Sequence, residues 1–154
     1  NARAKLAGIL AIYELERLEH HMRRGEALKD LKAHLSTDAL ELLDNAGYDL
    51  KNDPITADHI SDVAWDACRS ECLGVDYSAT WSAGSDFDGN PDKFKVWLTV
   101  GGPSCYITGD FGLHGHIDKD SIRFCYSWAC PTDWLSLSDA EEEALAWFVD
   151  RVAV

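Results

Sequence analysis

The stretch KFKVWLTVGGPSCYITGDFG, residues 93–112, decides the fold. Side chains alternate in character along its first half, which is the period of a β-strand with one buried face. That alternation places four apolar side chains on one face: Phe94, Val96, Leu98 and Val100. The alternation resumes after Gly-Gly-Pro, a turn sequence because glycine tolerates positive φ and proline cannot donate to a strand ladder. We therefore expect two antiparallel strands joined by a turn at 101–103.

The end of this stretch, Asp110-Phe111-Gly112, matches a triplet that binds Mg²⁺ in protein kinases. A kinase also needs a catalytic loop, a glycine-rich loop and a strand lysine, and the sequence carries none of these motifs. Asp and Gly are ordinary residues at the end of a strand. The sequence therefore predicts a turn here, no catalytic constellation elsewhere, and a non-enzymatic protein without a cofactor.

The residues before and after this pair of strands complete the fold prediction. Helical periodicity predicts helices over 3–23, about 26–35, 37–47 and 57–72, and strand periodicity returns over 75–83 and 121–128. Ser138 and Glu141 form a capping box at the start of a last helix. The predicted class is α+β: N-terminal helices, an antiparallel meander of about four strands, and a C-terminal helix packed on the sheet. We expect a single domain over 1–154, and a semi-independent helical segment over 1–50 stays open as an alternative.

The charge of the chain limits its partners. Asp and Glu number 27 against 14 Lys and Arg, for a net charge of −13, and residues 35–92 alone carry −11. Such a surface repels nucleic acid and attracts proteins with a basic surface, a class that includes nucleic-acid-binding proteins. No apolar run reaches the ~20 residues of a membrane helix, and no signal peptide is evident. The five cysteines form no paired Cys-x-x-Cys units, which favours reduced thiols and a cytoplasmic location. The sequence leaves the oligomeric state open.

An acidic face is the first candidate site. Asp58, Asp62 and Asp66 recur every four residues on the helix predicted over 57–72, and Asp49 and Asp53 precede them. Carboxylates in steps of ~6 Å along one helix face can imitate a phosphate backbone. The simpler interpretation is an ordinary solvated helix face.

Two further candidates lie in the strand region. Trp81, Trp97 and Tyr106 alternate with apolar residues and form an aromatic binding patch if one sheet face is open. The loop HGHIDKD offers His114, His116 and Asp118 as metal ligands, and its simpler interpretation is a connecting loop.

Three segments carry a resemblance to a protein family: VWLTVGGPSCYITGDFG, RFCYSWACPTDW and the acidic LSDAEEEALAWFV. Over about residues 60–150 the chain resembles a group of uncharacterised small acidic proteins of phages, prophages and plasmids. The resemblance implies a protein that binds a host or phage protein, as a DNA-mimicking inhibitor of the anti-CRISPR or antirestriction type. It identifies no catalytic residue. The alternatives are a metal-binding module or metal-dependent enzyme built on the His114/His116 loop, and a phage structural or assembly protein.

Overall fold

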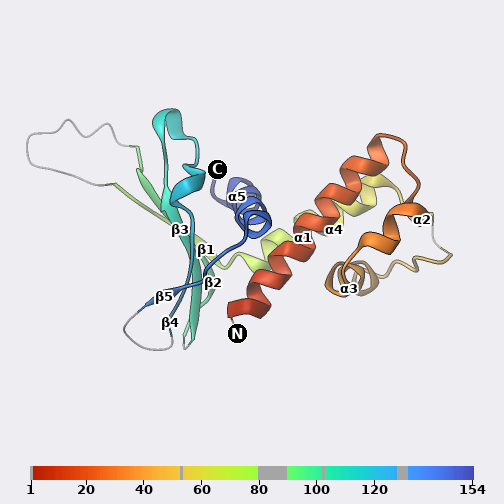
Figure 1. Cartoon of the computed structure of the whole chain (residues 1–154), viewed down its shortest axis with the longest axis horizontal. Helices are drawn as coiled ribbons and strands as arrows, with labels where there is room; N and C mark the ends of the chain where they lie inside the picture. Colours follow the sequence, from red (N-terminus) through yellow and green to blue (C-terminus); the bar gives the residue numbers. More distant parts are fainter. Residues whose placement is uncertain (1, 53, 80–89, 102, 128–131) are drawn as a thin grey trace, which may run out of the picture. The chain divides into compact units, whose positions relative to one another are not determined.

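The computed structural model (Figure 1) describes residues 2–52, 54–79, 90–101, 103–127 and 132–154. These residues form five α-helices and a five-stranded antiparallel sheet, so the predicted α+β class is confirmed. The chain divides into two compact units. One is the helical unit, Leu6–Glu71, and the other is the sheet unit, which joins the first residues up to Lys5 with Cys72–Val154. The helical unit thus extends beyond residue 50.

The helical unit is built from four α-helices. In chain order they are α1 (Ala2–Arg23), α2 (Leu28–Leu31), α3 (Thr37–Asn45) and α4 (Ala57–Glu71). Ser36 caps α3 by accepting a hydrogen bond from the Ala39 N–H at 3.2 Å. Thr56 caps α4 by accepting from the His59 N–H at 3.3 Å. Both caps confirm the helix starts that the sequence predicts.

The segment predicted as a helix over about 26–35 differs from that prediction. It consists of the single turn α2 and a 3₁₀ turn over Lys32–His34. A helix this short gains too few backbone hydrogen bonds to offset the cost of nucleation, so its geometry follows its packing. The Glu14 carboxylate of α1 accepts a hydrogen bond from the Ser36 N–H at 2.9 Å and ties the end of the segment to α1.

Helices α1 and α4 run antiparallel. A Cβ at Gly8 would lie 3.6 Å from the Glu71 carboxylate, and at the other end Arg23 pairs with Asp58 at 2.8 Å. The buried core of this unit draws on α1, α3 and α4, and it includes Ile9, Ile12, Leu15, Ala39, Leu43, Ile60 and Ala64.

The sheet is a meander in which every strand pairs with the next. Its strands are β1 (Gly74–Ser78), β2 (Lys93–Thr99), β3 (Ser104–Asp110), β4 (Arg123–Ser127) and β5 (Asp133–Trp134), in the order β1-β2-β3-β4-β5. The fifth strand exceeds the predicted number of about four. Its two residues pair as Cys125↔Trp134 and Tyr126↔Asp133. Two residues are too few to show strand periodicity in a sequence.

The inner face of the sheet is buried and carries the last helix, α5 (Asp139–Ala153). Its buried side chains include Phe94, Val96, Leu98, Ile107 and Phe124. The Tyr77 hydroxyl donates to the Ala153 carbonyl at 2.8 Å, which fixes the end of α5 to β1. The start of α5 has the capping box that the sequence predicts between Ser138 and Glu141. Figure 1 shows α5 along one side of the sheet.

Val100, the residue that follows β2, contradicts the sequence-based expectation. The register between β2 and β3 shifts between Trp97 and Thr99, so Thr99 pairs with the buried Cys105. This bulge reverses the alternation. Val100 therefore does not continue the buried face and is 70% exposed. None of the described helices combines the length and the apolar content needed to cross a bilayer.

Candidate functional site

The outer face of the sheet, opposite α5, is the first candidate. Among the described residues of the sheet unit, only α5 and the first turn of α1 are α-helical. That first turn lies beside α5, since Arg3 pairs with Glu141 at 3.1 Å. The described helical parts of this unit therefore leave the outer face open.

An aromatic row crosses this face, and we define it as Trp97, Tyr106, Cys125 and Trp134. These residues are successive partners across β2, β3, β4 and β5. The ring centroids of Trp97 and Tyr106 lie 5.2 Å apart in a tilted arrangement. Trp134 is 66% exposed, whereas the Cys125 thiol is buried and its burial raises its pKa. Exposed tryptophan in line with a fixed aromatic pair is typical of a binding surface.

The aromatic pair is held in place by its polar neighbours. The Trp97 Nε1–H donates to the Asp76 carboxylate at 2.7 Å. The Lys95 ammonium lies 4.8 Å from the Trp97 ring centroid and 4.5 Å from that of Tyr106. Both distances are within the range of cation–π attraction. The two rings and the ammonium are thus positioned before any partner arrives.

A second cation lies beside the aromatic row. Thr108 pairs with Lys95 on one side and with Arg123 on the other, so both cations occupy one line across the sheet. Arg123 donates to two backbone carbonyls, those of Asp120 at 2.9 Å and Ile122 at 2.8 Å. Within the described residues neither cation pairs with a carboxylate. The outer face therefore presents two cations that form no ion pair among the described residues, with the Asp76 carboxylate on the same face opposite Lys95.

Sequence reasoning located part of this surface. The structure brings together the predicted Trp97 and Tyr106, and Trp81 lies outside the described residues. Lys95 was missed, although residues two apart on a strand share a face, and that spacing was a usable signal. Trp134 was missed because no periodicity marks β5.

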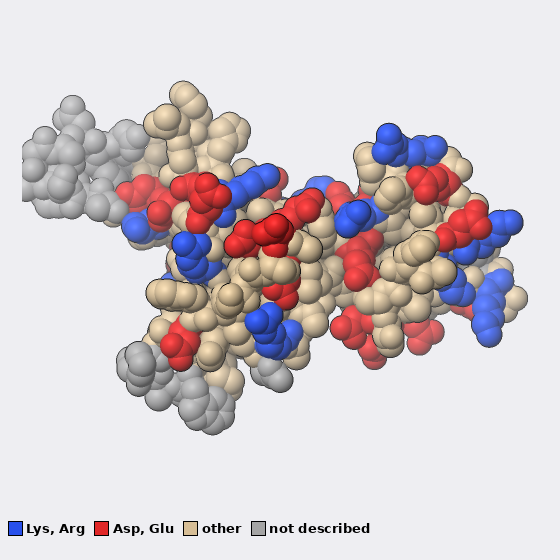
Figure 2. Space-filling view, viewed as in Figure 1, with Lys and Arg blue, Asp and Glu red and all other residues tan. Residues whose placement is uncertain are grey.

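The predicted acidic face is present on α4, but its charge is partly compensated. Asp58, Asp62 and Asp66 are all exposed. Asp58 pairs with Arg23 at 2.8 Å, and Asp66 pairs with Arg69 at 2.7 Å. Figure 2 shows basic side chains lying among acidic ones on the visible face of the helical unit. Only Asp62 of the three lacks an ion pair among the described residues, so the line of negative charge is interrupted at both ends.

Asp49 has a local structural role. Its carboxylate accepts from the Lys51 N–H at 2.9 Å and from the Asn52 side-chain amide at 2.6 Å. These two donors, the backbone N–H first, lower the pKa of Asp49. The carboxylate thus stabilises the loop before α4, and Asp53 lies outside the described residues.

The residues proposed as metal ligands do not form a ligand set. His114 and His116 are exposed, and His114 has a positive φ of 65° in a 3₁₀ turn. Asp118 caps the next 3₁₀ turn by accepting from the Asp120 N–H at 3.1 Å. Across the part of the chain that the structure describes, no three His, Cys, Asp or Glu side chains are grouped to hold a metal ion.

A scan against protein-family models found no match, and searches of curated proteins and of solved structures found none. The resemblance to proteins of mobile elements stays a prediction from the sequence.

Proposed function

We propose that this chain is a non-enzymatic protein-binding protein and that the outer face of the sheet is its binding surface. The observation that carries the proposal is the aromatic row, in which exposed Trp134 lies in line with the Trp97–Tyr106 pair. Aromatic residues and arginine are enriched among the residues that contribute most to binding at protein interfaces. Tyrosine and tryptophan bury a large area with only about two side-chain torsions to fix. Covering Trp134 with a partner removes its apolar surface from water.

The charge of this surface indicates the chemistry of the partner. Lys95 and Arg123 form no ion pair among the described residues, and Asp76 opposite Lys95 accepts a hydrogen bond from Trp97. A bound segment that places a carboxylate beside apolar side chains therefore complements the two cations. The net charge of −13 opposes a strongly anionic ligand such as a nucleic acid strand, so the partner carries only a few carboxylates among its apolar side chains. The expected partner is therefore a protein segment with mixed acidic and apolar side chains. The cytoplasmic location belongs to this proposal, since the four described cysteines are free thiols.

The experiment is capture of partners from a lysate of the source organism, using matched pairs of variants. Trp134→Ser removes the exposed indole of the outer face, and Trp65→Ser removes an indole that is 44% exposed on α4. Lys95→Gln and Lys51→Gln form a second pair, one on the outer face and one in the helical unit. We expect a partner that is captured by the wild type and both control variants, is lost with Trp134→Ser and is weakened with Lys95→Gln. A partner retained equally by both tryptophan variants would overturn the proposal, as would the absence of any captured protein.

The DNA-mimicking role suggested by the sequence is a second proposal, and it depends on the acidic face of α4. Its support is that three exposed carboxylates share one helix face, and the pairing of two of them with arginine weakens it. The triple variant Asp58→Asn/Asp62→Asn/Asp66→Asn separates the two proposals in the same assay. Loss of a nucleic-acid-binding partner in the triple variant, with capture intact in Trp134→Ser, would assign binding to α4. Solvent-exposed ionic contacts of that kind also weaken between about 50 and 300 mM salt as the Debye length falls.

A further inference from the structure

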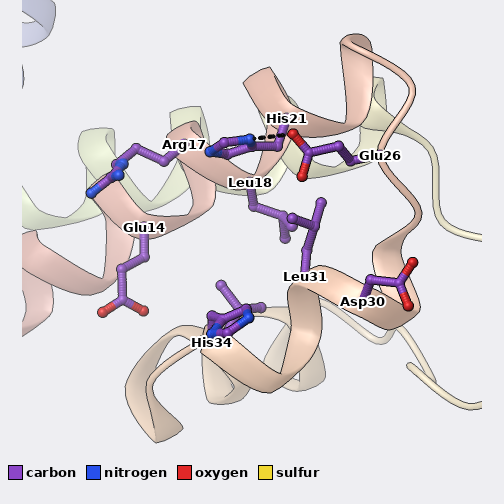
Figure 3. A pocket seen from close by; sticks show the side chains of 9 residues that line it. Glu14, Arg17, Leu18, His21, Glu26, Asp30, Leu31 and His34 are labelled. Atoms are coloured by element: carbon purple, nitrogen blue, oxygen red, sulfur yellow. Dashed lines mark hydrogen bonds and ion pairs between the residues drawn. The ribbon is translucent and has the colours of Figure 1, made fainter.

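The helical unit contains a pocket of about 530 Å³ that belongs to neither proposed binding surface. It lies between the second half of α1 and the segment from Glu26 to Leu35 (Figure 3). Its volume is within the range of small-molecule sites, which combine an apolar lining with a few polar groups.

The floor of the pocket is apolar. Leu18 of α1 is buried, and Leu31 and Leu35 of the opposite segment are half-buried. Figure 3 shows Leu18 and Leu31 facing each other in the middle of the pocket. The three leucines suit a hydrocarbon chain of modest length.

The rim of the pocket is acidic. The polar groups that line it are three carboxylates, one guanidinium and two imidazoles, from Glu14, Glu26, Asp30, Arg17, His21 and His34. The Glu14 carboxylate accepts a hydrogen bond from the Ser36 N–H, and the Glu26 carboxylate accepts one from the His21 ring at 2.8 Å. The Asp30 carboxylate has no partner among the described residues. Figure 3 shows Glu26 and Asp30 at one end of the pocket, with Arg17 and Glu14 at the other.

We propose that this pocket binds a primary alkylammonium ion. The ammonium group lies at the end of the pocket where Figure 3 shows Glu26 and Asp30, and the Asp30 carboxylate supplies a charge-assisted hydrogen-bond acceptor. The alkyl chain lies along Leu18, Leu31 and Leu35 and gains from leaving water. The charge of the rim selects a cation, and the net charge of −13 attracts it. This inference does not depend on the outer face of the sheet.

The test is a titration of the ¹⁵N-labelled full chain, followed by NMR, with three probes. n-Hexylammonium carries both the charge and the chain, methylammonium carries only the charge, and 1-hexanol carries only the chain. We expect hexylammonium to bind about tenfold or more tightly than either of the others, with amide shifts at Leu31 and His34. Equal affinity for hexylammonium and hexanol would overturn the ammonium assignment. Shifts confined to the indole signals of Trp97 and Trp134 would overturn the pocket as the site.

A matched pair of variants tests the rim. Asp30→Asn removes the carboxylate without a partner, and Asp62→Asn removes an exposed carboxylate elsewhere in the same unit. Both residues lie at the surface, so both variants are expected to fold. Asp30→Asn should weaken hexylammonium binding about tenfold, and Asp62→Asn should leave it unchanged. Equal effects of the two variants would reduce the interaction to general attraction by an acidic protein and would refute the site.

Discussion

The ammonium nitrogen of Lys95 lies 4.5 Å from the centre of the Tyr106 ring, on the outer face of the sheet. At a partly exposed site such a pair contributes about 0.5–1 kcal/mol to the free energy of unfolding. A double-mutant cycle with Lys95→Gln and Tyr106→Leu, measured by urea unfolding, should give a coupling energy of about 0.5 kcal/mol. Additive effects of the two substitutions would show that the ammonium does not interact with the ring.

Gly109 is predicted to tolerate no side chain. A Cβ at this position would lie 2.6 Å from Cζ of Phe94, a buried ring that can move only by displacing the core around it. Gly109→Ala should lower the free energy of unfolding by about 1–3 kcal/mol through overpacking. Gly74→Ala is the control, because nothing lies within 4 Å of a Cβ there. In a Phe94→Leu background the cost of Gly109→Ala should fall, and an unchanged cost would contradict the steric explanation.

The loop before α4 should show a pH dependence that originates at Asp49. The Lys51 N–H and the Asn52 amide lower the folded-state pKa of this carboxyl. A lowered pKa means that the stabilising contribution is present above the unfolded-state pKa and is lost as the pH falls through the folded-state pKa. Asn52→Ala removes one donor, so the pKa of Asp49 should rise towards its ordinary value. A ¹³C NMR titration of the carboxyl carbon measures this, and an unchanged pKa in the variant would argue against the hydrogen bond.

The labelling rate of the Cys125 thiol measures how well the outer face is packed around it. It is buried in the aromatic row opposite Trp134, and burial raises its pKa, so it should react slowly with iodoacetamide. Trp134→Ser should accelerate the labelling of Cys125, as identified by mass spectrometry. Cys105, buried on the inner face, should be unaffected. Equal acceleration at both thiols would indicate general unfolding instead of local exposure.

Local patterns were sufficient for most of the fold. Ser36, Thr56 and Ser138 cap the helices where the sequence predicts, because a capping side chain bonds to N–H groups only a few residues away. The β2–β3 hairpin follows from alternation and a turn sequence in the same way. Val100 departs from the prediction because a β-bulge is defined by the pairing of two strands. The sequence of one strand does not show where its register with the next strand shifts.

The candidate sites also combine features that follow from local sequence with features that depend on tertiary packing. The sequence by itself determined the α+β class, the helix caps and the alternation of Trp97 and Tyr106 with apolar residues, because these depend on neighbours along the chain. Only the tertiary structure decided that Arg23 compensates Asp58, that Trp134 extends the aromatic row, and that Leu18 and Leu31 line one pocket. Those pairs join residues far apart in sequence. Their contacts depend on how helices and strands pack, and a local sequence pattern does not indicate which distant segments will meet.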